Sequence, residues 1–188
     1  MITLQPASYN HLELVCHIIK ESFQKQAKIL AITQEKYLNF VAFETVERVP
    51  KRMNSGDQVI ISFINDEPMG TVSYKADHAL QKGIIRRLAV LPKYRGYGYG
   101  ELLMSQAEQQ LKQENIRYIE LAIVAQFQGL QRYYERLGYM AKEKNFFPPY
   151  PLRFYLWKRN CIILRQGQNV RASKHFSIFK VSLKDKGA

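Results

Sequence analysis

Three glycines alternate with tyrosines in the stretch GYGYG, at Gly96, Gly98 and Gly100. Glycine adopts positive φ readily and lets the backbone approach a ligand without a Cβ in between. Such a loop directs consecutive N–H groups at one point, and a helix that follows it leaves its first four N–H groups unpaired. The stretch therefore indicates a site for an anionic phosphate group.

A strand and a helix are predicted on either side of this loop. Residues 84–91 are mostly aliphatic, which is typical of a strand that is buried on both faces. After the loop, apolar residues recur at helical spacing through Leu111. Arg86 and Arg87 interrupt the aliphatic run, which predicts either an open site nearby or a bulge in the strand.

Two nucleotide-binding patterns fail on this loop. The dinucleotide fingerprint GxGxxG, started at Gly96, needs a third glycine where Glu101 stands, and the Walker pattern needs Lys and then Ser or Thr after the last glycine. The pattern that remains is Arg95-x-x-Gly98-x-Gly100, directly after the strand sequence LAVLP. It resembles the (Gln or Arg)-x-x-Gly-x-(Gly or Ala) loop with which the GNAT superfamily of N-acetyltransferases binds acetyl-CoA.

A second stretch carries the same resemblance. Residues 133–139, YYERLGY, are similar to another GNAT signature, an aromatic pair followed by Leu-Gly-aromatic. With the predicted order of elements, the resemblance covers about residues 1–159. It implies an α/β protein with the acyl-CoA N-acyltransferase (GNAT-like) fold, a mixed central sheet flanked by helices.

The resemblance also implies a cofactor site. The backbone of Leu88 and Val90 would pair with the pantetheine arm of acetyl-CoA, and N–H groups from Arg95 to Gly100 would hold its pyrophosphate. The full set of implied cofactor-binding residues is Leu88, Ala89, Val90, Arg95, Gly96, Tyr97, Gly98, Tyr99, Gly100 and Phe127.

The chain departs from the family pattern at three places. Tyr97 and Tyr99 are bulkier than usual, and either stack near the adenine or pack on the helix. Phe127 stands where many members have an asparagine that contacts the cofactor. Members often carry a glutamate just before the Leu-x-Val of the central strand, whereas residues 84–87 here are IIRR.

The resemblance assigns the catalytic acid to Tyr134, whose hydroxyl would protonate the departing thiolate. An isolated tyrosine at this place would more simply be a packed aromatic with its hydroxyl satisfied. Glu120, on the strand predicted next to the central one, and His78 remain as candidates for the general base.

The rest of the chain is interpreted from periodicity and turn residues. A strand is predicted at 2–6, a helix from Asn10, and a second helix over 33–52 that Pro50 ends or kinks. A hairpin follows, with strands at 58–64 and 69–74 and a four-residue loop. The remaining predicted elements are a strand at 118–124, a helix at 126–137 ended by Gly138, and strands at 139–147 and 152–159 around a turn at 148–151.

The predicted domain organisation is an acetyltransferase domain over residues 1–159 and a C-terminal extension over 160–188. The extension forms either further strands or a basic tail that mediates an interaction, and the sequence leaves both open. No internal repeat or low-complexity linker divides the chain.

The formal net charge of +12 is unevenly distributed. Residues 1–75 are neutral in sum, residues 76–159 carry +7, and residues 160–188 carry +5. This asymmetry favours an acidic partner, although a basic surface without a partner is an equal alternative. A polycationic acceptor such as a polyamine is disfavoured, because it would be repelled. An acidic protein, a nucleic-acid-associated target or a small amine bearing phosphate or carboxylate remains open, as does a homodimer.

Composition excludes several other classes. Hydrophobic content of 46% with 23% charged residues is typical of a globular chain, with no long apolar run for a membrane span or basic leader for secretion. Cys16 and Cys161 have no metal-ligand spacing, so neither a disulfide framework nor a metal is predicted. Composition thus predicts a soluble, cytoplasmic protein, and the GNAT resemblance implies an acetyl-CoA-dependent N-acetyltransferase that acts on a primary amine by direct attack. The alternative is a catalytically weak CoA-binding module that regulates or binds nucleic acid.

Overall fold

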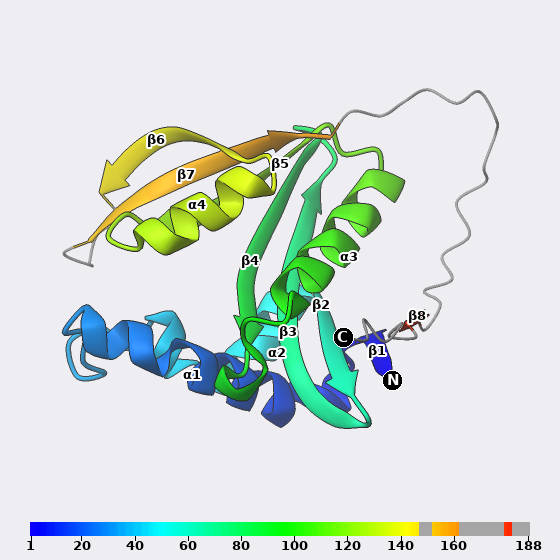
Figure 1. The fold of residues 1–188 in the computed structure, drawn as a ribbon, viewed down its shortest axis with the longest axis horizontal. Helices are drawn as coiled ribbons and strands as arrows, with labels where there is room; N and C mark the ends of the chain where they lie inside the picture. The colour runs from blue at the N-terminus through cyan, green and yellow to red at the C-terminus, as the bar shows by residue number, and fades with distance from the viewer. Residues whose placement is uncertain (147–151, 162–178, 182–188) are drawn as a thin grey trace, which may run out of the picture. The chain divides into compact units, whose positions relative to one another are not determined.

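The computed structural model describes residues 1–146, 152–161 and 179–181 (Figure 1). The helices are α1 (Leu12–Ile29), α2 (Arg48–Asn54), α3 (Tyr99–Gln113) and α4 (Gln128–Arg136), with short 3-10 turns η1 (Tyr9–His11), η2 (Val41–Phe43) and η3 (Pro92–Tyr94). The strands are β1 (Ile2–Pro6), β2 (Gln58–Ile64), β3 (Glu67–Asp77), β4 (Lys82–Val90), β5 (Tyr118–Val124), β6 (Met140–Phe146), β7 (Arg153–Asn160) and β8 (Phe179–Val181).

The strands are hydrogen-bonded in the order β6-β7-β5-β4-β3-β2-β1-β8. The β4–β5 pair is parallel, whereas β1–β2, β1–β8, β5–β7 and β6–β7 are antiparallel. This mixed sheet with helices confirms the predicted α/β class. The registered pairs of β4 with β5 run only from Lys82↔Tyr118 to Ile84↔Glu120.

The chain divides into two compact units. Among the described residues, the first comprises residues 1–73, 87–107 and 179–181, and the second comprises residues 74–86, 108–146 and 152–161. β3, β4 and α3 each contribute residues to both units.

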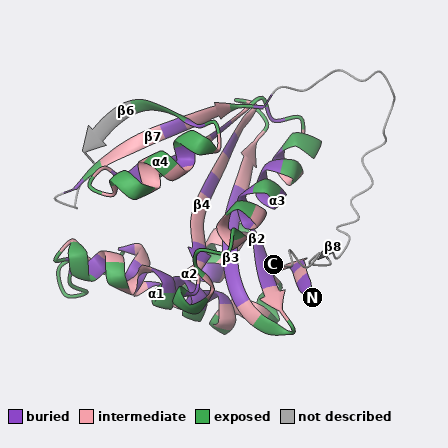
Figure 2. Ribbon diagram, in the orientation of Figure 1, coloured by how far each residue is buried: buried purple, intermediate pink, exposed green. Residues whose placement is uncertain are grey.

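The core of the first unit forms where α1 packs on strand residues. Val15, Ile18 and Ile19 of α1 are fully buried. They cluster with Val59 and Ile61 of β2. In Figure 2 buried and exposed positions alternate along α1, as expected of an amphipathic helix with one face on a core.

The second unit is built on the β5–β7 ladder, which pairs seven residues from Tyr118↔Asn160 to Val124↔Phe154. Trp157 of β7 is 1% exposed and Ile119 of β5 is fully buried. Gly83 allows close packing here, because an added Cβ would lie 2.7 Å from Leu111 Cδ1.

The predicted helix over 33–52 is wrong. Its residues form isolated turns, η2 and the start of α2. Pro50 does not end a helix but lies in the first turn of α2, where a missing N–H removes no intrahelical bond.

The hairpin between β2 and β3 is confirmed, but its loop is shorter than predicted. β3 begins at Glu67, so only Asn65 and Asp66 connect the strands. Their φ values of +49° and +65° are those of a type I′ turn, whose twist suits a two-residue hairpin.

Near the C-terminus, Phe179–Val181 pairs with β1 as strand β8. The rest of residues 162–188 and the predicted turn at 148–151 lie outside the described residues. The division into a domain at 1–159 and an extension thus remains a prediction. No helix in the described part of the chain is long and apolar enough to cross a membrane, and no three metal-ligating side chains cluster within it.

Candidate functional site

The glycine loop lies directly before α3, in the first unit. Gly96 and Gly98 have φ values of +87° and +80°. An added Cβ at either position would meet no atom within 4 Å, so the space beside the loop is open. Glu101 donates its N–H back to Gly98 O at 3.0 Å. Within the described chain, the N–H groups of Gly96, Tyr97 and Gly98 are bonded to no backbone acceptor, which leaves them available to an anion.

Arg95 braces this loop from within the protein. Its Nε donates to Val90 O at 3.0 Å, and its Nη2 donates to Ser22 O at 2.6 Å. Its own N–H donates to Pro92 O at 3.3 Å. Arg95, the first residue of the predicted phosphate motif, thus ties the start of the loop to the end of β4 and to α1.

Three tyrosines gather on the loop. Tyr97, 71% exposed, stacks on Tyr99 with ring centroids 5.9 Å apart. Tyr94 meets Tyr99 edge-on at 6.4 Å and donates its hydroxyl to Glu67 Oε2 at 2.6 Å. The Tyr97 ring is therefore an accessible flat surface beside the open N–H groups.

β4 leads into the loop through Leu88, Ala89 and Val90. Ala89 is buried, whereas Leu88 and Val90 are half-buried. Gly70 of β3 makes this packing tight, because an added Cβ would lie 2.6 Å from Ala89 O. The carbonyl of Val90 already accepts a hydrogen bond from Arg95 Nε.

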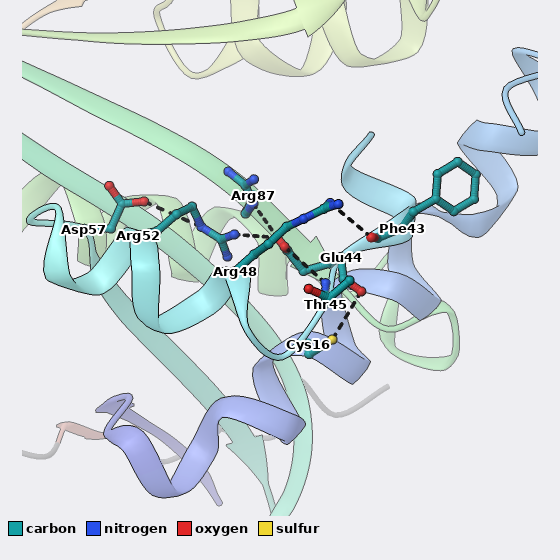
Figure 3. A network of polar contacts seen from close by, with 8 residues as sticks. All are labelled: Cys16, Phe43, Glu44, Thr45, Arg48, Arg52, Asp57 and Arg87. Carbon is teal, nitrogen blue, oxygen red and sulfur yellow. Dashed lines mark hydrogen bonds and ion pairs between the residues drawn. The ribbon is translucent and has the colours of Figure 1, made fainter. Parts of the chain in front are cut away.

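A buried carboxylate lies next to this end of β4 (Figure 3). The Glu44 side chain, 1% exposed, accepts a 2.8 Å hydrogen bond at Oε2 from Arg87 Nε. Arg52 Nη1 of α2 also lies 2.8 Å from Oε2, although the two groups are not aligned for a hydrogen bond. Arg52 Nε is 3.9 Å from Asp57 Oδ2. Burial and the charge of Arg87 lower the pKa of Arg52, so Glu44 balances two guanidiniums that repel each other.

Arg87 has a φ of +52° inside a strand. A non-glycine residue in this left-handed region costs about 1–2 kcal/mol and persists only where its surroundings hold it. The sequence predicted an open site or a bulge at the arginine pair, and the structure has a left-handed residue there, at Arg87.

In the second unit, Tyr134 of α4 is buried, with 7% exposed. Its ring meets Tyr133 edge-on at 5.0 Å and Tyr139 edge-on at 5.9 Å. Burial, and to a lesser extent Tyr133, raises the pKa of Tyr134 well above that of a free tyrosine. The hydroxyl therefore stays protonated at neutral pH and remains a proton donor.

A buried ionic cluster supports the ring of Tyr139. Its hydroxyl donates to Glu108 Oε1 at 2.8 Å, and Arg159 Nη1 donates to Glu108 at 2.9 and 2.8 Å. The N–H of Tyr139 also donates to Tyr134 O at 3.0 Å. These bonds fix the edge-on contact that Tyr139 makes with Tyr134.

The two base candidates and Phe127 also lie in the second unit. Glu120 of β5, with 19% of its side chain exposed, pairs with Lys82 Nζ at 3.6 Å. His78 is 67% exposed and pairs with Glu114 at 3.2 Å. Phe127 is half-buried at the N-cap of α4. Of the two candidates, Glu120 is the more enclosed.

The loop and the β4 residues therefore belong to one unit, and Tyr134, Glu120, His78 and Phe127 belong to the other. Glu44 was not predicted from the sequence. Its partners are Arg52 and Arg87, the latter 43 positions away.

A family model for the acetyltransferase (GNAT) family matches residues 27–139. The chain belongs to this family. The match includes the glycine loop of this GNAT protein, its buried Tyr134 and the Arg87 turn in β4, and it confirms the family predicted from the loop and the YYERLGY stretch. A search of curated protein sequences finds no match.

Solved structures show the same fold at low sequence identity. PaiA N-acetyltransferase from Thermoplasma acidophilum, in complex with coenzyme A, matches with a TM-score of 0.67 and 18% identity, over 86% of this chain and 99% of that one. The ribosomal-protein-S18-alanine N-acetyltransferase from Escherichia coli matches with a TM-score of 0.69 and 14% identity, over 90% and 100%. A GNAT acetyltransferase from Staphylococcus aureus matches with a TM-score of 0.66 and 20% identity, over 85% and 99%. These matches confirm the GNAT-like fold.

Proposed function

We propose that this GNAT protein transfers the acetyl group of acetyl-CoA to a primary amine, by direct attack of the amine in a ternary complex. The observation that carries the proposal is the set of unbonded N–H groups at Gly96, Tyr97 and Gly98, in open space before α3. A pyrophosphate supplies the acceptors that these donors lack.

The residues of the first unit fit the donor. Backbone groups of Leu88 and Val90 would bind the pantetheine arm, while the loop N–H groups would bind the pyrophosphate. Acetyl-CoA supplies an activated thioester, and the N–H of Val90 would stabilise the oxyanion that forms when the amine attacks it. The exposed ring of Tyr97 offers a stacking surface for the adenine.

Tyr134 is the proposed general acid. A tyrosine hydroxyl is protonated at neutral pH, so the group carries a proton for the departing CoA thiolate. Two edge-on ring contacts and the bond from Tyr139 hold the residue in place.

Glu120 is the proposed base, acting directly or through water. Deprotonating an alkyl ammonium with a pKa near 10.4 costs about 4–5 kcal/mol of free energy at pH 7, so the reaction needs a proton acceptor. Lys82 keeps the Glu120 carboxylate in an ion pair and only partly exposed. His78 is less suited, because its ring is largely exposed and pairs with Glu114.

The acceptor class follows from charge. A chain of net charge +12 attracts an amine carried by an acidic molecule and repels a polycation. We therefore propose an acceptor that also bears carboxylate or phosphate groups.

The test is release of free thiol from acetyl-CoA with a panel of amines, including acidic peptides and amines that bear phosphate. The wild-type protein should release thiol with at least one acidic acceptor. Tyr134→Phe keeps the ring contacts and should lower kcat about 100-fold while CoA affinity is retained.

Cofactor binding without thiol release for any amine would contradict the enzymatic proposal and favour the regulatory module. Binding of nucleic acid that weakens steeply with salt would identify that module as a nucleic-acid binder.

A further inference from the structure

β4 contains a backbone conformation that its own sequence does not favour. Arg87 has a φ of +52° in the middle of the strand and directly precedes Leu88. A glycine would adopt this conformation freely, whereas an arginine must be held there by its surroundings. Residues 88–90 follow directly after this left-handed residue.

The Arg87 side chain contacts Glu44. The only charge-assisted hydrogen bond of Arg87 within the described residues runs from Nε to Glu44 Oε2, at 2.8 Å. Glu44 is itself held by two hydrogen bonds. Its backbone carbonyl accepts one from Cys16 Sγ at 3.4 Å, and its side-chain Oε1 accepts one from Thr45 N at 3.4 Å. Figure 3 shows its carboxylate between the side chains of Arg52 and Arg87.

Glu44 is not a free base. Its side chain is 1% exposed, and one oxygen already meets two guanidiniums. An amine substrate cannot approach a carboxylate that is enclosed in this way. The Glu44 carboxylate therefore contacts Arg87 and does not touch the reacting atoms.

We propose that Glu44 is a positioning residue that, through Arg87, holds the left-handed turn of β4 and thereby presents the backbone of Leu88 to Val90 to acetyl-CoA. The cofactor part of this inference rests on the proposed function. The assignment of Glu44 as the residue that fixes the turn stands on the ion pair and the φ of Arg87.

The deciding comparison is between Arg87→Ala and Arg87→Gly. Both remove the ion pair with Glu44 and leave Arg52 to balance the carboxylate. Only alanine keeps the cost of positive φ, so Arg87→Ala should weaken CoA binding about tenfold. Arg87→Gly should bind CoA within about threefold of the wild-type affinity.

Two further variants separate this role from loss of charge. Arg48 lies on the same helix as Arg52 but donates to Phe43 O at 3.2 Å, so Arg48→Ala is a matched control and should leave CoA affinity unchanged. Glu44→Gln should weaken CoA binding, and adding Arg87→Gly should relieve most of that loss, because the double variant no longer contains two unbalanced guanidiniums.

A measurement without cofactor keeps the two proposals distinguishable. Hydrogen exchange of the amides at residues 88–91 should be faster in Arg87→Ala and Glu44→Gln than in wild type, and close to wild type in Arg87→Gly. Equal impairment of Arg87→Gly and Arg87→Ala, or unchanged exchange and CoA affinity in both, would overturn the positioning role. Wild-type protein that fails to bind CoA would instead overturn the proposed function and the cofactor part of this inference, whatever the exchange data show.

Discussion

The Tyr139 hydroxyl donates a 2.8 Å hydrogen bond to the buried carboxylate of Glu108, 31 positions earlier in the chain. Arg159 donates to both oxygens of the same carboxylate. A tyrosine of the YYERLGY stretch is thus tied to α3 and β7 by one acidic residue.

We expect Glu108→Ala to lower the free energy of unfolding by about 2–3 kcal/mol, because it leaves a buried hydroxyl and a guanidinium without their acceptor. Urea denaturation would measure the change. Glu114→Gln is the control: its pair with His78 is exposed, so the loss should stay below about 0.5 kcal/mol. Equal losses in the two variants would show that the buried cluster adds no stability.

Stability should fall as the pH rises above about 10. Burial raises the pKa of Tyr74, Tyr134 and Tyr139, so the folded state keeps protons there that the unfolded state has released. Each such tyrosine contributes a decline of up to about 1.4 kcal/mol per pH unit. Urea denaturation between pH 9 and 10.5 should show a shallower decline for Tyr134→Phe than for wild type, and equal slopes would contradict this assignment.

Substitution by alanine should change stability in opposite directions at two glycines that have open space beside them, Gly98 and Gly129. Gly98 has a φ of +80°, so Gly98→Ala should cost about 1 kcal/mol and weaken CoA binding, because its Cβ enters the space left for the ligand. Gly129 lies in α4 without that strain, so Gly129→Ala should stabilise by about 0.5–1 kcal/mol. Thermal unfolding with and without CoA would separate the two effects, and a stabilised Gly98→Ala would argue against the strained loop.

The hairpin turn at Asn65 and Asp66 offers a stabilising substitution. Both residues have positive φ, and a type I′ turn favours Asn-Gly. Asp66→Gly should therefore raise the free energy of unfolding by about 0.4–1 kcal/mol, measured by urea denaturation. A loss of stability would mean that the Asp66 side chain contributes more than the relieved strain.

The sequence predicted best those elements that local pattern determines. The strand at 118–124 has the predicted bounds, because its aliphatic run is flanked by polar residues and packs in a buried ladder. A loop with left-handed glycines before α3 was predicted because glycine adopts positive φ readily, and Gly96 and Gly98 do so; that the loop binds phosphate stays a prediction. Reasoning from periodicity failed over residues 33–52. The apolar residues there have near-helical spacing, but they lie in turns, in η2 and in α2 and do not form one helix.

Glu44 could not be found in the same way. Its role depends on Arg87, which is far away in sequence, and on a backbone angle that arginine does not favour. The arginine pair in β4 did signal an irregularity, but no local pattern identifies the partner that holds it. Long-range ion pairs of this kind become visible only when the chain is folded.

The two bonds from Arg95 have a thermodynamic consequence for the loop that follows it. Because its guanidinium fastens Val90 O and Ser22 O to one side chain, the start of the loop is already ordered before a ligand arrives. An ordered loop has little conformational entropy left to lose on binding. Arg95 thus contributes to affinity by ordering the loop in advance, while its guanidinium donates to Val90 O and Ser22 O.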